Sequence, residues 1–213
     1  MTDDIVKSGI STSNNYEIKS TIYLGKRGIF MKSAKVREYT IVALLVAMAV
    51  VIPMYSFKVV IPPFSMTLGA HIPVFIAMFI SPYAVVLATI GNIFGFLPLG
   101  PVVMARAATH LIFGLIGAYM LRKKMNYLVV IGATMLIHAI AESIVALGFM
   151  YWTISNGGAA QASTWLVFFG TVVHHALDFA VATPILLALS KAKYIKYSIT
   201  EGISFKKKKR EAE

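Results

Sequence analysis

The stretch ALLVAMAVV, residues 43–51, lies in the first membrane-length apolar segment of the chain. Its alanines Ala43 and Ala47 are four residues apart, so a helix places them on one face, one turn above each other. Leucine would cross a bilayer equally well, whereas alanine lets a second helix backbone come close in lipid. The stretch therefore predicts a membrane-spanning helix with a small-residue face. Gly91 and Gly95, also four apart, predict a second close helix contact.

The composition is that of an integral membrane protein. Of the 213 residues, 58% are hydrophobic and 14% are charged, and the mean hydropathy is +0.75, whereas a soluble domain is about half apolar and about a quarter charged. The net charge of +11 comes from basic residues that flank the apolar segments, which is the distribution of the positive-inside rule. We therefore expect contact with membrane lipid and no nucleic-acid partner. Because the sequence contains no cysteine, disulfides and thiolate metal sites are excluded.

The apolar segments predict an all-α integral membrane protein, a six-transmembrane-helix bundle. A proline-rich connection, residues 58–71, follows the first predicted helix. On this division residues 1–35 form a polar, disordered N-terminal extension, residues 36–192 form the membrane domain, and residues 193–213 form a basic cytoplasmic tail. The predicted helices cover residues 37–57, 68–81, 82–97, 102–121, 126–152 and 162–191.

The basic residues predict the orientation of these helices. With the N-terminus inside, three clusters of Lys and Arg fall at cytoplasmic helix ends, and the outer loops carry only Lys58. By the positive-inside rule both termini are then cytoplasmic, and the chain is a multi-pass protein of the cell membrane. The cytoplasmic clusters are Lys32, Lys35 and Arg37; Arg122, Lys123 and Lys124; and Lys191, Lys193 and Lys196.

The last three predicted helices each carry two polar residues four positions apart. This spacing places both residues on one helix face, and ionisable residues within a bilayer face the bundle interior or a wet cavity. At about 1.5 Å rise per residue, Arg106 and Glu142 both fall in the outer half of the membrane. Asn92 and His71 are further polar residues in the apolar region. The three pairs are Arg106 with His110, His138 with Glu142, and His174 with Asp178.

Three interpretations of these residues are open. The planar guanidinium of Arg106 suits a carboxylate, which predicts a pocket for a small polar solute. Alternatively, Arg106, Glu142 and Asp178 neutralise one another and hold the bundle together. The five histidines and two carboxylates could also bind a transition metal. However, the adjacent His174 and His175 point about 100° apart on a helix, and we predict no metal site.

The chain also resembles a known family of membrane proteins. Six short spans, an N-terminus inside, the AxxxA pattern of Ala43 and Ala47, and the segment VVIPPFSMTLGAHIPVFIAMFISPYAVVLATIGNIFGF, residues 59–96, are similar to the S component of energy-coupling-factor (ECF) vitamin transporters. Within that family the segment is most similar to niacin-type S components, and the resemblance covers residues 36–192. It implies a high-affinity substrate-binding subunit of an ATP-driven importer for a small water-soluble vitamin, best matched by niacin (nicotinate). It also implies that this chain has no catalytic residue and no cofactor, because ATP is used by partner subunits.

The resemblance further implies partners and residue roles. Ala43 and Ala47 would dock on the transmembrane T component, with two ATPase subunits completing the complex; packing within the same chain is the alternative. The pocket would lie near the extracellular side, closed by a gating loop at Pro62 and Pro63, and Arg106 would hold the nicotinate carboxylate. Trp152, Tyr151 or Trp165 would cover the ring, and Asn92, His110 or His138 would meet the pyridine nitrogen. The predicted substrate-binding residues are Asn92, Arg106, His110, His138, Glu142, Trp152, Trp165, His174 and Asp178.

Other function classes remain as alternatives. Intramembrane His, Glu and Asp residues could carry protons in a stand-alone, proton-coupled secondary transporter, although the sequence shows no inverted repeat of the kind such transporters have. The chain could equally be an S component for another vitamin, a vitamin precursor or a transition-metal ion. An enzyme would need a nucleophile beside a base, and Ser143 next to Glu142 is the nearest approach to one.

Overall fold

The computed structural model describes residues 35–159, 164–192, 194 and 195. The predictions for the N-terminal extension and for the basic tail beyond residue 195 therefore lie outside the described residues. The chain divides into two units between Ile41 and Val42. The arrangement given below is that of the second unit, and the helix that contains the junction is described from Val42 onward.

Helices make up most of the described residues. Four helical stretches among them are long and apolar enough to cross a membrane: Lys35–Tyr55, Pro101–Arg122, Tyr127–Ser155 and Thr164–Lys191. The chain is thus a mostly helical membrane protein, and the count of six spans stays a prediction. Besides Lys35–Tyr55, the helices are α2 (Ile72–Met78), α3 (Pro82–Gly95), the short 3-10 helix η1 (Leu97–Leu99), α4 (Pro101–Ala108), α5 (His110–Arg122), α6 (Tyr127–Ser155) and α7 (Thr164–Lys191).

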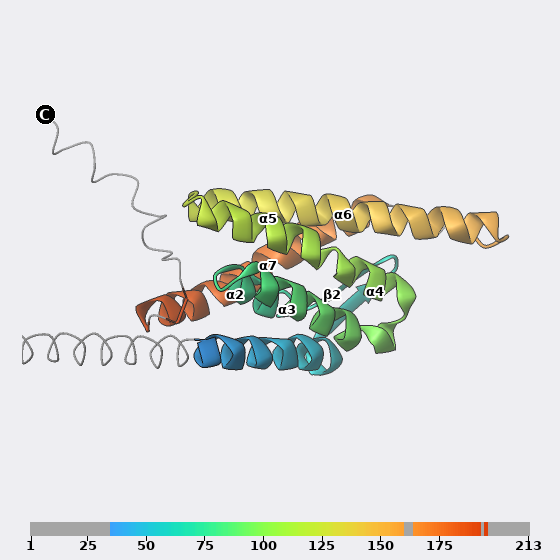
Figure 1. Ribbon diagram of the computed structural model, residues 1–213. Helices are drawn as coiled ribbons and strands as arrows, with labels where there is room; N and C mark the ends of the chain where they lie inside the picture. The colour runs from blue at the N-terminus through green and yellow to red at the C-terminus, as the bar shows by residue number, and fades with distance from the viewer. Residues whose placement is uncertain (1–34, 160–163, 193, 196–213) are drawn as a thin grey trace, which may run out of the picture. The chain divides into compact units, whose positions relative to one another are not determined.

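The second predicted helix is much shorter than the sequence indicated. The prediction covered residues 68–81, whereas α2 has only seven residues. All of them are buried, and α2 packs against α3, α5 and α7 (Figure 1). Because exposed backbone is costly in lipid, so short a helix persists only where its neighbours cover it.

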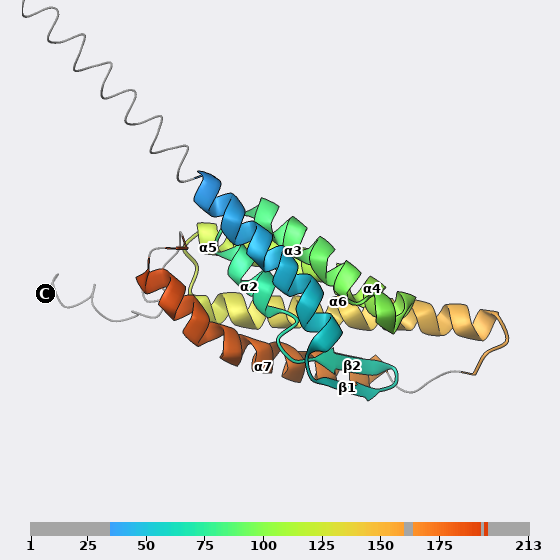
Figure 2. The same ribbon diagram turned by 90° about the horizontal axis from the view of Figure 1, so that it is seen from below.

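A β-hairpin replaces the irregular connection predicted before α2, so the fold is not purely helical. Strand β1 (Lys58–Ile61) pairs antiparallel with β2 (Phe64–Thr67), with Lys58 opposite Thr67 and Ile61 opposite Phe64. The two strands are joined by the two-residue loop Pro62–Pro63, whose peptide bond is cis. Strand β2 packs on α7, and Figure 2 shows the hairpin beside that helix.

The fourth predicted helix is interrupted at Thr109. The sequence predicted one helix over residues 102–121, but α4 ends at Ala108 and α5 begins at His110. Both the Thr109 backbone N–H and its hydroxyl donate to the Arg106 carbonyl oxygen, at 3.0 and 2.6 Å. This i→i−3 bonding tightens one turn into the 3-10 form. Arg106 and His110 therefore lie on either side of the interruption.

The glycines of α3 confirm the predicted close helix contact. A Cβ added at Gly91 would lie 2.9 Å from the Val46 carbonyl oxygen, and one at Gly95 would lie 2.7 Å from the Val50 carbonyl oxygen. Ala49, on the same side of the first helix, is fully buried. The backbones of the first helix and α3 thus approach so closely that only glycine fits on α3, as expected for helices packed in lipid.

The outward surface of the helices is apolar. Large side chains such as Leu44, Leu128 and Ile144 are more than 60% exposed. A soluble monomer rarely exposes large apolar patches, whereas a bilayer favours them. The polar side chains are instead gathered inside, and their arrangement defines the candidate site.

Candidate functional site

A buried polar cluster lies among α2, α3, the α4–α5 junction, α6 and α7, under strand β2 of the hairpin. The structure brings together every predicted substrate-binding residue except the two tryptophans. Helical periodicity explains this result, because each i,i+4 pair presents its polar face inward. The polar cluster consists of His71, Asn92, Arg106, His110, His138, Glu142, His174, His175 and Asp178, and all of these residues are buried.

Arg106 joins α4 to the hairpin and to α6. Its Nη2 donates to Glu142 Oε2 at 2.8 Å and to the Ser65 carbonyl oxygen at 3.1 Å. Its Nη1 donates to Ser65 Oγ at 3.2 Å and to the Pro63 carbonyl oxygen at 3.3 Å. The remaining donor, Nε, is buried and meets no hydrogen-bond acceptor among the described residues. The guanidinium therefore lies directly beneath the predicted gating loop.

Glu142 balances the charge of Arg106. Besides Arg106, it accepts a hydrogen bond from Thr171 Oγ1 at 2.6 Å, and its Oε1 lies 3.3 Å from His138 Nε2. The side chains of Arg106 and Glu142 are only 3% and 7% exposed. The mutual neutralisation considered for the sequence is thus observed for this pair. A buried pair of this kind leaves an uncompensated charge if one partner is removed.

Asp178 fastens the end of the hairpin to α7. Its carboxylate accepts from the backbone N–H groups of Gly69 and His71, at 2.6 and 3.1 Å, and from His71 Nδ1 at 2.9 Å. His174 Nε2 lies 3.2 Å from the same carboxylate and 2.9 Å from the Thr67 carbonyl oxygen, which it can reach as a donor. Gly69 has φ +85°, a conformation that side chains disfavour, which lets the chain turn into this contact.

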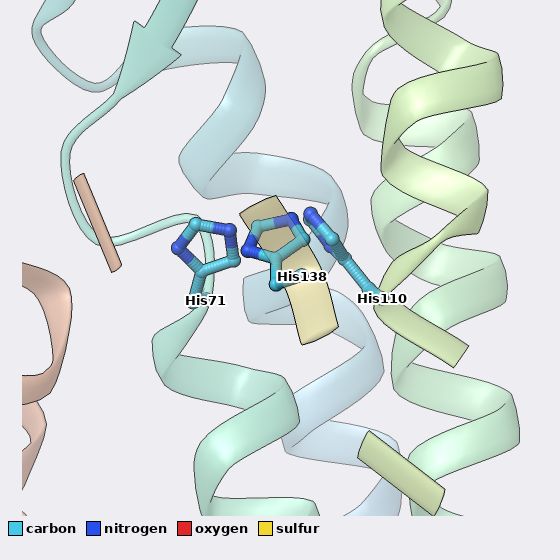
Figure 3. Close-up of side chains that lie close together, drawn as sticks. All are labelled: His71, His110 and His138. Carbon is cyan, nitrogen blue, oxygen red and sulfur yellow. The ribbon is translucent and has the colours of Figure 1, made fainter. Parts of the chain in front are cut away.

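Five imidazole rings pack together in the middle of the polar cluster, in tilted and edge-to-face arrangements. The ring centroid of His71 lies 4.6 Å from that of His110 and 4.7 Å from that of His138, and the latter two are 5.0 Å apart (Figure 3). His174 and His175 lie 4.4 and 5.5 Å from His71. His71 is therefore central, although it was not among the predicted site residues. It precedes α2 and belongs to no helical stripe, so only its polarity within an apolar region could have indicated it.

Asn92 holds one edge of the histidine group. Its Nδ2 donates to the Ala70 carbonyl oxygen at 3.1 Å and lies 3.0 Å from His110 Nδ1. Its Oδ1 is buried and has no hydrogen-bond donor within the part of the chain that the structure describes. Asn92 thus positions both the turn before α2 and the ring of His110.

Two cavities adjoin the hairpin, and Ser65 lines both of them. The inner cavity, about 20 Å³, lies in the polar cluster and is lined among others by Arg106, His110 and Glu142. That volume holds about one water-sized sphere. The outer cavity, about 340 Å³, is lined by the hairpin tip and by apolar residues of α4 and α6. Its volume falls within the range of small-molecule pockets, so the hairpin separates a pocket of ligand size from the polar cluster.

Comparison with known proteins gives one informative relative. No protein-family model matches the chain, and no solved structure matches it. The niacin transporter NiaX of Lactococcus lactis subsp. cremoris (strain MG1363) is 35% identical over 176 residues, which are 76% of this chain and 78% of that transporter. This chain belongs to the niacin transporter family. The resemblance to niacin-type S components is confirmed by this relationship.

In this member of the niacin transporter family, the tryptophans lie outside the polar cluster. Trp152 is 65% exposed and lines an open apolar groove of α4 and α6, and Trp165 is 68% exposed and stacks on Phe169. Arg106 Cζ lies instead over the ring of Phe64, 5.9 Å from the ring centroid. Phe64 packs over Gly170 of α7, where an added Cβ would lie 2.5 Å from its ring. Sequence reasoning missed Phe64 and Ser65 because no hairpin was predicted.

The small-residue face of the first helix has an exposed and a buried part. Ala43 and Ala47 are exposed, and Ala49 is buried against α3. Packing within the chain therefore involves Ala49, and the pair Ala43 and Ala47 is open on the surface of this niacin transporter family member. The predicted gating prolines Pro62 and Pro63 form the hairpin tip and line the outer cavity.

Proposed function

We propose that this chain is the substrate-binding S component of an ECF-type ATP-driven importer, and that its substrate is niacin in the form of nicotinate. The relationship to a niacin transporter supports the substrate class. The observation that carries the proposal is the guanidinium of Arg106, buried against the inner cavity with its Nε free of an acceptor among the residues described. A planar fork of this kind matches a carboxylate in two hydrogen bonds.

Nicotinate enters from the outer cavity and displaces the hairpin tip. The inner cavity of about 20 Å³ is too small for an aromatic ring, so the hairpin must move before the ligand reaches Arg106. Arg106 then exchanges its bonds to Pro63 and Ser65 for bonds to the carboxylate and keeps its ion pair with Glu142. Pro62 and Pro63 act as the gate, with the hairpin reclosing over the bound ring.

The remaining residues of the polar cluster orient the ring. Asn92, His110 and His138, which lie close together in the polar cluster, are the residues that meet the pyridine nitrogen. Phe64 is the aromatic residue placed to cover the ring when the hairpin closes. Glu142, His174 and Asp178 hold Arg106 and the hairpin in position. In this proposal Trp152 and Trp165 contribute to the membrane surface.

Transport requires partner subunits. Ala43 and Ala47 form an exposed, small-residue surface, which suits close helix contact with a transmembrane T component. Two ATPase subunits supply the energy, so this chain binds and releases the vitamin and is neither an enzyme nor a nucleotide-binding protein. The basic residues at alternate helix ends support six spans in the cell membrane with both termini in the cytoplasm.

Calorimetric titration of the purified chain tests the substrate. We expect saturable nanomolar binding of nicotinate and much weaker binding of nicotinamide, which lacks the carboxylate charge. Equal affinity for both compounds would contradict the carboxylate anchor, and no binding of either by folded protein would contradict the substrate.

Reconstitution tests the transport class. Proteoliposomes that contain this chain with a T component and two ATPases should take up nicotinate only when ATP is supplied. Uptake by this chain alone, driven by a pH gradient, would instead establish the secondary-transporter alternative.

A further inference from the structure

We propose that His71, His110 and His138 form a binding site for one divalent transition-metal ion of the zinc, cobalt or nickel class. From the sequence we predicted no metal site, because the adjacent His174 and His175 point about 100° apart on a helix. In the folded chain these three histidines come from the turn before α2, from α5 and from α6. They are 1%, 2% and 0% exposed.

The geometry of the three rings suits tetrahedral coordination. One ligand nitrogen from each ring lies within 4.8 Å of those of the other two. A tetrahedral metal with bonds of about 2.0–2.1 Å holds its nitrogen ligands about 3.4 Å apart. Side-chain rotations that bring the ligand nitrogens about an ångström closer together therefore close the site. Figure 3 shows the three rings side by side.

The outer nitrogens of all three rings are already oriented. His71 Nδ1 is bonded to Asp178 at 2.9 Å, His138 Nδ1 lies 3.2 Å from His175 Nδ1, and His110 Nδ1 lies 3.0 Å from Asn92. In each ring Nδ1 therefore has a partner and Nε2 is the nitrogen left for the metal; in His138, Nε2 would exchange its 3.3 Å contact with Glu142 Oε1 for the metal. Metal-bound histidines commonly donate their second nitrogen to a carboxylate or another fixed acceptor. Asp178 supplies such a carboxylate to His71.

Two buried atoms gain partners if the metal binds. His138 Nε2 is buried and makes no hydrogen bond within the described residues, although Glu142 Oε1 lies 3.3 Å away. Asn92 Oδ1 is likewise unsatisfied there. When His110 binds metal through Nε2, its Nδ1 carries the proton. Rotation of the Asn92 amide then lets Oδ1 accept that proton, in exchange for the amide's bond to the Ala70 carbonyl oxygen.

Charge balance independently favours a cation at this position. The buried charged residues of the described chain are Arg106, Glu142 and Asp178, which leave one surplus negative charge when the histidines are neutral. Nicotinate would add a second negative charge; this step rests on the proposed function. One divalent cation cancels both charges, and a buried uncompensated charge is strongly unfavourable.

The donor atoms select the class of metal. Imidazole nitrogen binds zinc, cobalt, nickel and copper ions, whereas magnesium and calcium prefer oxygen ligands. The lining of the inner cavity includes His71 and His110 as well as Arg106 and Glu142. The fourth coordination position of a three-histidine site would open toward this cavity.

Untagged full-length protein, purified in detergent and stripped with a chelator, provides the test. We expect one equivalent of ZnCl₂ to bind in calorimetric titration, and CoCl₂ to give the visible absorption bands of tetrahedral cobalt. His71→Gln, His110→Gln and His138→Gln should each weaken zinc binding by about 100-fold or more, and Asn92→Ala by about 10-fold.

His174→Gln discriminates between the two possible metal-binding groups, because His174 with His71 and Asp178 forms the other one. A loss of zinc affinity clearly smaller than that of His138→Gln supports the proposed site, whereas a loss equal to or larger than that of His138→Gln assigns the metal elsewhere and overturns it. Thermal unfolding, followed by tryptophan fluorescence, identifies folded variants. Because a ligand variant could fail to fold, the cobalt spectrum of the unaltered chain decides independently: an octahedral spectrum contradicts the site.

Titration of stripped and zinc-loaded protein with nicotinate separates this proposal from the proposed function. Nicotinate binding without any zinc binding overturns the metal site and leaves the vitamin assignment intact. Zinc binding without nicotinate binding supports the metal site and contradicts the proposal that nicotinate is the substrate.

Discussion

Replacing Arg106 with methionine tests whether this residue binds the ligand or only neutralises Glu142. The two side chains form a 2.8 Å ion pair and are almost fully buried. Removing Arg106 leaves the Glu142 charge unpaired, which costs about 3–5 kcal/mol in buried pairs. With about 2–4 °C per kcal/mol for a chain of this size, the melting temperature should fall on the order of 10 °C.

A second substitution separates stability from binding. In the double variant Arg106→Met with Glu142→Gln, the unpaired charge is gone, so most of the lost stability should return. Binding should not return, because the charge-assisted hydrogen bonds from Arg106 to the ligand carboxylate, at about 1.5–3 kcal/mol, are still missing. That loss corresponds to about 10- to 100-fold weaker nicotinate binding.

Thermal unfolding and calorimetric titration of the single and double variants provide the readouts. Lys58→Met is the matched control for loss of a positive charge, since Lys58 of β1 donates to the Met54 carbonyl oxygen. Its nicotinate affinity should stay within twofold. If the double variant recovers nicotinate affinity along with stability, Arg106 is a purely structural residue and the reasoning is refuted.

Three further substitutions test other parts of the structure. Gly95→Ala should lower the free energy of unfolding by about 1–3 kcal/mol, because its Cβ would lie 2.7 Å from the Val50 carbonyl oxygen; Gly148→Ala, with no atom within 4 Å, should not. Equal melting temperatures would disprove that contact. Ala47→Trp should leave nicotinate affinity unchanged and stop ATP-driven uptake in proteoliposomes, and normal uptake would exclude a docking role. Asp178→Asn should speed nicotinate dissociation in stopped-flow measurements, because it weakens the hold on the hairpin; an unchanged rate would argue against that hold.

Helical periodicity explains why much of the polar cluster could be predicted. A residue's neighbours four positions away share its helix face in any bundle, so Arg106 with His110 and His138 with Glu142 could be paired without a structure. The pairing survives even the interruption at Thr109, because a single tightened turn changes the angle between the two residues only slightly.

The hairpin could not be predicted in the same way. Each strand has four residues, and an isolated two-stranded hairpin is marginal by itself. Its stability comes from distant partners, chiefly Asp178 on α7 and Arg106 on α4. These contacts span more than 40 residues of sequence and leave no local signal. His71 depends on the same turn and was missed for the same reason.

The tryptophans illustrate a different limit. Their depth along the helix suggested an outer aromatic layer, but depth does not specify the direction a side chain takes around the helix axis. Trp152 lies near the end of the 29-residue α6 and faces outward. Phe64, which does lie over Arg106, comes from the hairpin instead.

The bonds from Asp178 to Gly69 and His71 determine how the hairpin can move. The chain just before β1 is also held in place, because Ser56 Oγ donates a hydrogen bond to the Leu68 carbonyl oxygen at 2.7 Å. With the segments before β1 and after β2 both held, the hairpin would swing as a rigid arm. The arm is about 13 Å long, because each strand has four residues at about 3.3 Å each. A swing of about 30° carries the Pro62–Pro63 tip about 7 Å, roughly the width of one aromatic ring. If the hairpin is the gate, as proposed, the angle of a hinge at residues 68–71 limits the size of the substrate, and a bulkier substrate would have to break the Asp178 bonds to enter.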